Sequence, residues 1–151
     1  MKRMPDERRR DFLRCAGAAL SLVALGTRAF AAAECHYPIP QADGVTIDRT
    51  NQVILVRFQN SAYAFNLACP HENTALKWLP KDGRFQCPRH ESKYQPNGTF
   101  MSGRATRNMD RLAIRREGND LIVNLDAMWQ SDRDAAAWAA ATVSLNDQMT
   151  R

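Results

Sequence analysis

Two short motifs near the middle of this 151-residue chain contain side chains that bind metals. The first is Cys69-x-His71, and the second, after fifteen intervening residues, is Cys87-x-x-His90. Together they supply two thiolates and two imidazoles, a ligand set that suits either Zn²⁺ or an iron–sulfur centre. These four side chains are therefore the candidate metal ligands.

The way the ligand types are divided between the motifs separates these two alternatives. Structural Cys₂His₂ zinc sites usually place two cysteines on one element and two histidines on another. Here each motif supplies one cysteine and one histidine, which fits a two-iron cluster with both cysteines on one iron and both histidines on the other. We therefore expect a [2Fe–2S] cluster on Cys69, His71, Cys87 and His90. The alternative is a non-redox structural or interaction protein with a zinc site. A further alternative for the two cysteines is a disulfide between Cys69 and Cys87.

The segments that lead into both motifs are predicted strands. Residues 45–47 and 53–56 are rich in β-branched side chains, and residues 63–67 alternate in polarity up to the first motif. Residues 80–83 form a strong Pro-x-Asp-Gly turn signal, and the short strand 84–86 then enters the second motif. Both ligand pairs therefore leave strand ends, as a clamp built from two loops requires.

The chain after the second motif predicts a hairpin and then a helix. Residues 112–116 and 121–125 flank Gly118-Asn119 and predict a closing hairpin. Residues 131–134 have the pattern of a helix-capping box with Asp in place of Glu. Beyond it, four residues recur at helical spacing, and we expect them to pack a C-terminal helix on its own domain: Trp138, Ala141, Leu145 and Met149.

Residues 1–33 have the features of an export signal. Arg9-Arg10 precedes an apolar run over residues 16–26, in the pattern of the twin-arginine route. The run is shorter than the roughly 20 residues that span a bilayer, and small residues offer a cleavage site after Ala31 or Ala33. We therefore expect a periplasmic protein exported in its folded state; the alternative is a retained signal that anchors it to the inner membrane.

Charge and cysteine count set two further limits. The formal net charge is +5, but residues 1–33 contribute +4 of it, so we expect no nucleic-acid partner. Removal of the signal leaves three cysteines, an odd number. Cys35 has no evident partner, and its role stays open.

Around the two motifs the sequence resembles the Rieske iron–sulfur family. Each ligand cysteine precedes a proline, and the second motif continues as His90-Glu91-Ser92-Lys93-Tyr94. This run is close to the H-G-S-x-Y of Rieske subunits in quinol-oxidising cytochrome bc complexes. The likeness covers about residues 45–125, nearly all of the expected folded domain.

The resemblance implies a fold and roles for the site residues. The expected Rieske domain covers residues 34–126 and is all-β, with stacked antiparallel sheets and a small cluster-binding subdomain within it. A C-terminal helical tail over residues 127–151 is expected to follow. Cys69 and Cys87 would bind the inner iron, and His71 and His90 the outer iron. Ser92 would donate its hydroxyl to a bridging sulfide, and Tyr94 would donate to a ligand cysteine sulfur. Such hydrogen bonds favour the reduced state and raise the potential.

Three departures from the family pattern distinguish this chain. Thr74 and Arg89 stand where Rieske subunits of bc complexes carry two further cysteines, so the disulfide that braces their cluster loops is missing. Glu91 replaces a glycine, and residues 103–107 lack the prolines of the family's shielding loop. These differences argue against a standard bc complex and leave cluster ligation untouched.

The expected function is one-electron transfer, as a soluble carrier or as the small subunit of an oxidoreductase or quinol-oxidising complex. Its partner would be a cytochrome-like acceptor or an oxidoreductase large subunit, with quinol as a further candidate that binds an exposed edge of His71 or His90. Residues 77–116 hold ten basic and three acidic groups, which favours an acidic docking surface. An autonomous oxygenase is excluded, because only His36 remains for a second iron site that needs two histidines.

Overall fold

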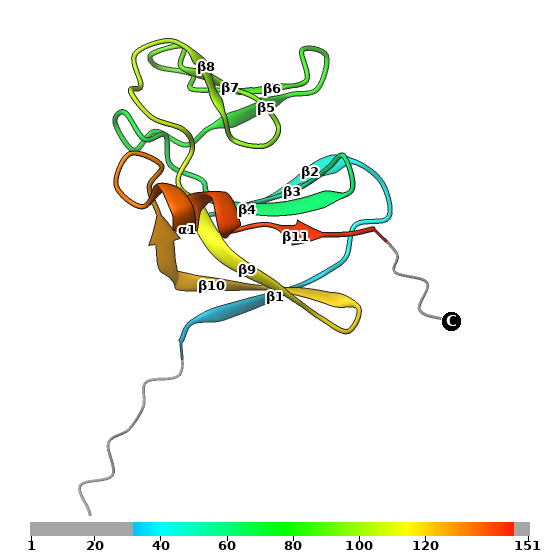
Figure 1. Ribbon diagram of the computed structural model, residues 1–151. Helices are drawn as coiled ribbons and strands as arrows, with labels where there is room; N and C mark the ends of the chain where they lie inside the picture. The colour runs from blue at the N-terminus through cyan, green and yellow to red at the C-terminus, as the bar shows by residue number, and fades with distance from the viewer. Residues whose placement is uncertain (1–31, 147–151) are drawn as a thin grey trace, which may run out of the picture. The chain divides into compact units, whose positions relative to one another are not determined.

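The structure is a computed structural model that describes residues 32–146, so residues 1–31 of the predicted export signal and Met149 lie outside the described residues. Antiparallel strands form a seven-stranded and a four-stranded sheet (Figure 1). Within the described residues, one short helix follows near the C-terminal end. The predicted all-β fold, with a smaller subdomain and a C-terminal helix, is confirmed.

The larger sheet contains seven strands: β1 (Glu34–Pro38), β2 (Gly44–Asp48), β3 (Val53–Phe58), β4 (Ser61–Asn66), β9 (Arg111–Glu117), β10 (Asp120–Trp129) and β11 (Val143–Ser144). Their order is β1-β10-β9-β4-β3-β2, with β11 paired to β4. The two ends of this path approach each other, because the hydroxyl of Tyr37 in β1 donates a hydrogen bond of 2.9 Å to the carboxylate of Asp48 in β2. The sheet is therefore curled on itself.

The smaller sheet is an insertion between β4 and β9. It contains four strands: β5 (Lys77–Leu79), β6 (Arg84–Gln86), β7 (Lys93–Tyr94) and β8 (Phe100–Ser102). They pair in chain order, and we call residues 67–110 the small subdomain. In Figure 1 this subdomain lies above the larger sheet, and both metal-binding motifs belong to it.

Strand β3 lies between two hydrophobic cores, and each of its faces is buried in one of them. Successive side chains of a strand point to opposite faces, and here Val53 and Leu55 enter one core while Ile54 and Val56 enter the other. The first core fills the curled larger sheet. The second core joins the larger sheet to the small subdomain and includes both ligand cysteines. The candidate metal site is therefore anchored directly on the central packing of the protein.

The C-terminal region corrects part of the prediction. Residues 111–117 and 120–129 form the predicted hairpin of β9 and β10. The helix α1 (Ala135–Ala140) is much shorter than the predicted tail, and β11 follows it. The predicted capping box is wrong: Asp134 is itself the N-cap and its side chain caps nothing, while the hydroxyl of Ser131 accepts a hydrogen bond from the amide of Asn108.

Arg111 in β9 determines where the helix packs. This side chain is only 5% exposed, and its guanidinium lies 3.7 Å from the centroid of the Trp138 ring. Its Nη1 donates to the carbonyl of Trp138, and the Trp138 indole N–H donates to the carbonyl of Met109, each at 2.8 Å. Burial lowers the pKa of Arg111 to about 10, so the group stays cationic at neutral pH. Trp138 thus packs on its own domain.

Within residues 32–146, no helix is long and apolar enough to cross a bilayer.

Candidate metal centre

The first motif sits in a loop that is closed by its own backbone. The amide of Cys69 donates to the carbonyl of Thr74 at 2.8 Å, and the amide of Asn73 donates to the carbonyl of Cys69 at 2.9 Å. Asn73, four residues after the cysteine, has a φ of 53°. Asparagine is one of the few residues that adopts this left-handed conformation routinely. The loop is therefore a tight turn that presents His71 at its outer side.

The second motif repeats the same backbone pattern. The amide of Cys87 donates to the carbonyl of Ser92 at 2.9 Å, and the amide of Glu91 donates to the carbonyl of Cys87 at 3.0 Å. Glu91 again lies four residues after the cysteine, with a φ of 56°. A left-handed conformation costs a residue with a Cβ atom about 1–2 kcal/mol. This explains why glycine suits the position in the family that the sequence resembles.

The two cysteine side chains lie in the core between the sheets. Cys69 and Cys87 are both fully buried, and both are free thiols, so the alternative of a disulfide between them is wrong. Burial raises the pKa of the Cys69 thiol, and hydrogen bonds from the Tyr94 hydroxyl and the His71 amide offset only part of that rise. A buried thiolate needs a cationic partner. The two sulfurs therefore fit ligation of a metal.

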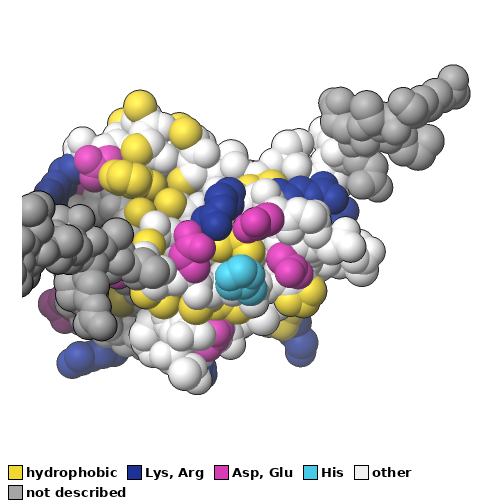
Figure 2. All heavy atoms as spheres, turned by 90° about the horizontal axis from the view of Figure 1, so that it is seen from below, with side chains coloured by type: hydrophobic (Ala, Val, Ile, Leu, Met, Phe, Trp, Pro, Cys, Tyr) yellow, Lys and Arg dark blue, Asp and Glu magenta, His cyan; other side chains and the backbone are white. Residues whose placement is uncertain are grey.

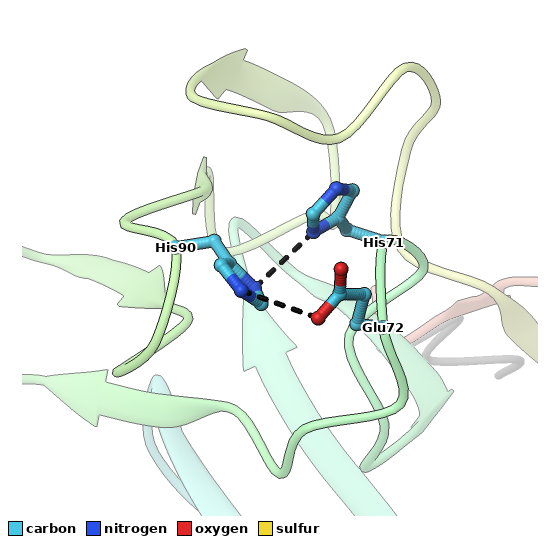
Figure 3. A group of neighbouring side chains, drawn as sticks. All are labelled: His71, Glu72 and His90. Carbon is cyan, nitrogen blue, oxygen red and sulfur yellow. Dashed lines mark hydrogen bonds and ion pairs between the residues drawn. The ribbon is translucent and has the colours of Figure 1, made fainter.

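The two imidazoles face each other at the outer side of the loops (Figure 3). Nδ1 of His71 lies 3.2 Å from Nδ1 of His90, and the ring planes are inclined at 82°. Two imidazole nitrogens on one tetrahedral metal, each about 2.1 Å from it, would be about 3.4 Å apart. The separation of the two Nδ1 atoms therefore fits two ligands of a single iron.

The sulfur and nitrogen atoms do not gather around one point. Within residues 32–146, the one group of three or more ligand atoms that lie within 4.8 Å of one another consists of His71, Glu72 and His90, without either cysteine. A single zinc ion would bring two sulfurs and two nitrogens within about 4 Å of one another. The separation into a sulfur pair and a nitrogen pair instead fits two irons, and it argues against the zinc alternative.

Two hydroxyl groups approach the sulfur side of this site. The Tyr94 hydroxyl lies 3.4 Å from Sγ of Cys69, and burial raises the pKa of that phenol. The Ser92 hydroxyl oxygen accepts a hydrogen bond of 3.0 Å from the amide of Ala105, and the Ser92 side chain also interacts with the Tyr94 hydroxyl. Both side chains are fully buried. The structure thus brings Ser92 and Tyr94 together with the four candidate ligands.

A third loop holds the second motif in place, which the sequence analysis missed. Gly103 has a φ of 115°, and a Cβ atom on it would lie 2.4 Å from Cα of Ser92. The same loop supplies the Ala105 amide to the Ser92 hydroxyl. Close backbone contact therefore supports the second loop in a chain that has no disulfide there. The only signal in the sequence was a glycine in the segment that lacks the expected prolines.

Glu72 is the other residue that the sequence analysis missed. Its Oε2 atom lies 3.2 Å from Nε2 of His90 (Figure 3). The sequence analysis singled out Glu91, which follows a ligand histidine directly but is exposed in the structure. Glu72 belongs to the first loop and His90 to the second, so their contact depends on how the two loops pack. No local sequence pattern could therefore have predicted it.

Several known proteins are similar to this chain in sequence. The family model "Rieske [2Fe-2S] domain" matches residues 29–121. The chain is 27% identical over 74 residues to the cytochrome b6-f complex iron-sulfur subunit of Chlorobaculum thiosulfatiphilum, which covers 49% of this chain and 41% of that protein. It is 29% identical over 80 residues to cytochrome b6-f complex iron-sulfur subunit 1 of a Nostoc species, which covers 53% of this chain and 44% of that protein.

The matched regions are limited in length. The chain spans less than half the length of these two curated relatives. Among solved structures, it is similar to a cyanobacterial plasma membrane Rieske protein from Synechocystis PCC 6803, with 24% identity and a TM-score of 0.45. That similarity covers 53% of this chain and 83% of the other.

The contact between Gly103 and the second loop leads to a stability prediction. Gly103→Ala forces the Ser92 backbone to move, and overpacking of this kind costs about 1–3 kcal/mol in addition to the strain of the left-handed conformation. We expect a lower midpoint of urea unfolding and faster loss of iron from the purified protein. Gly118→Ala is the matched control, because Gly118 also has a positive φ but no atom lies within 4 Å of its Cβ position. Equal losses in the two variants would contradict the role of the third loop.

Proposed function

The chain belongs to the Rieske [2Fe–2S] family, and we propose that it transfers electrons through a Rieske-type cluster held by Cys69, His71, Cys87 and His90. The observation that carries this ligand assignment is the pair of Nδ1 atoms 3.2 Å apart, next to two buried and unpaired cysteines. When bound, the cluster supplies a site that accepts and releases one electron.

Differences in burial support the assignment of ligands to the two irons. Cys69 and Cys87 are fully buried and would hold the inner iron. His71 and His90 are partly exposed and would hold the outer iron. The outer iron would therefore lie on the side of the site nearer to solvent, and electron exchange with a partner would occur on that side.

Ser92 and Tyr94 set the electron affinity of the site in this proposal. The Tyr94 hydroxyl lies next to Sγ of Cys69, and the Ser92 hydroxyl would donate to a bridging sulfide of the cluster. Both side chains are in a dry environment where hydrogen bonds to sulfur are strong. Donation to sulfur favours the electron-rich, reduced state. We therefore place the potential in the upper part of the Rieske range of roughly −150 to +300 mV.

We also infer where the protein acts and which kind of protein it serves. Residues 1–33 would direct the folded protein to the periplasm by the twin-arginine route, with retention at the inner membrane as the alternative fate of the signal. Residues 34–126 would form the Rieske domain. The C-terminal segment expected from residue 127 onward begins within β10 and adds β11 to the larger sheet, so its described part belongs to the same domain. Two matched relatives are subunits of cytochrome b6-f complexes. By analogy, this chain would be a carrier or small subunit that serves a cytochrome-like acceptor or an oxidoreductase large subunit.

The charge of the small subdomain supports an acidic partner, although the patch is smaller than the sequence suggests. Arg111 is buried, and Arg115 forms a 2.6 Å ion pair with Glu34. Within residues 32–146, five basic side chains of the small subdomain form no ion pair: Lys77, Lys81, Arg89, Lys93 and Arg104. Two of its four acidic residues, Asp82 and Asp110, already pair with arginines.

The face of the protein seen from below carries both acidic and basic side chains. There, side chains of both signs are interspersed around a histidine (Figure 2). This face is turned away from the small subdomain, which lies at the top of Figure 1. The unpaired basic side chains of the small subdomain would therefore be the docking surface for an acidic partner, with Arg89 next to the proposed ligand His90.

Voltammetry of the purified protein tests the electron-transfer proposal. We expect one reversible one-electron couple, and a lower potential in Ser92→Ala and in Tyr94→Phe, because each variant loses a hydrogen-bond donor. A net loss of about 1 kcal/mol per hydrogen bond corresponds to about 40 mV for one electron. Tyr63→Phe is the control, since Tyr63 stacks on Phe65 in the core and contacts neither cysteine. Absence of any couple would contradict the proposal, and unchanged potentials would remove Ser92 and Tyr94 from it.

Salt dependence tests the proposed docking surface. The bimolecular rate of electron transfer to an acidic acceptor should fall about tenfold between low salt and about 0.15 M, because the attraction is screened. Arg89→Gln should flatten this dependence, whereas Arg49→Gln, an exposed arginine in the turn between β2 and β3, should not. A rate that is insensitive to salt in the unmodified protein would rule out electrostatic docking.

A further inference from the structure

A carboxylate from the first loop reaches the histidine of the second loop. Glu72 directly follows His71, and its Oε2 atom lies 3.2 Å from Nε2 of His90 (Figure 3). The Glu72 side chain is 52% exposed, whereas that of His90 is only 14% exposed. Glu72 therefore lies over the outer edge of His90, between that ring and the solvent.

The orientation of the His90 ring is defined at both of its nitrogens. Nδ1 is turned toward Nδ1 of His71, and Nε2 is turned toward Glu72. If Nδ1 binds iron, Nε2 carries the remaining proton and is a hydrogen-bond donor. A metal-bound histidine commonly donates this second N–H to a carboxylate, which fixes the ring and increases electron donation to the metal.

No comparable contact exists at the other histidine. Within residues 32–146, Nε2 of His71 has no carboxylate within ion-pair distance. His71 is also only half-buried. The two imidazoles of this site are therefore not equivalent: a carboxylate occupies the edge of one, and the edge of the other is open.

We propose that Glu72 caps the outer edge of His90, so that His71 alone presents an open imidazole edge to a partner or substrate. This inference rests on the proposed ligation by Nδ1 of both histidines. The cap excludes His90 as the hydrogen-bonding site for a quinol or a docking protein. It also places a negative charge beside a ligand of the outer iron, where it disfavours the added electron and opposes the effect of Ser92 and Tyr94.

Glu91 provides a matched control within the same loop. It is also a glutamate next to a ligand histidine, and it is exposed. Within the described residues, its carboxylate forms no hydrogen bond or ion pair. Replacement of either glutamate by glutamine removes one negative charge near His90, but only replacement of Glu72 changes the contact at Nε2.

The reduction potentials of the holoprotein variants test the electrostatic part of the proposal. Glu72→Gln should shift the reduction equilibrium about tenfold toward the reduced state, which is about 59 mV for one electron. Glu91→Gln should shift it clearly less. Equal shifts in the two variants, or no shift in Glu72→Gln, would overturn the inference. Iron and acid-labile sulfide are measured in each sample: an unmodified protein without them contradicts the proposed ligation itself, whereas full cluster content with equal shifts contradicts only the cap.

Chemical modification of the oxidised holoprotein tests the cap without relying on the potential. At mildly alkaline pH, diethyl pyrocarbonate acylates an accessible Nε2 that has released its proton to the solvent, and peptide mass mapping assigns the modified residue. In the unmodified sequence we expect His71 to react several times faster than His90. In Glu72→Ala the rate at His90 should rise toward that at His71. Equal rates at the two histidines before any substitution would overturn the proposal, even if the Glu72 variants assembled no cluster.

Discussion

Burial of two thiol groups between the sheets is the constraint on which the rest of this structure depends. Cys69 and Cys87 lie in the same core as Ile54 and Val56 of β3, and both are fully buried. Thiolates in such a place are stable only with a cationic partner. The core and the metal centre therefore depend on each other, and this fits a site in which the inner ligands are sulfur and the outer ligands, nearer to water, are imidazole.

Two loops of the same backbone conformation meet this constraint, and a third supports them. Each loop is closed by a pair of backbone hydrogen bonds around its cysteine. Chains with a disulfide between such loops have a covalent brace, whereas here Gly103 and Ala105 contact Ser92 through the backbone. That support consists of close packing and one buried hydrogen bond. It is therefore more sensitive to a single added methyl group than a covalent link would be.

The parts of the fold that the sequence predicted correctly are those with strong local patterns. The strands β2, β3, β4 and β6 and the hairpin of β9 and β10 have β-branched runs or clear turn signals. Strands β5, β7, β8 and β11 have only two or three residues each, too few for a recognisable pattern, and β11 pairs with the distant β4. The predicted helical tail was too long, since an alanine-rich pattern does not reveal that Arg111 holds Trp138 or that residues 143–144 pair with β4. The four candidate ligands were found by spacing, whereas Glu72 was missed because its contact crosses between loops.

The central claim is that one imidazole nitrogen from each loop binds the same iron. Pulsed electron paramagnetic resonance on the reduced protein, produced with histidine that carries a heavy nitrogen isotope, measures this directly. The account predicts hyperfine coupling to two histidine nitrogens, one of which disappears in His71→Cys and the other in His90→Cys. A reduced protein with no histidine coupling, or with two couplings that survive both substitutions, would contradict it.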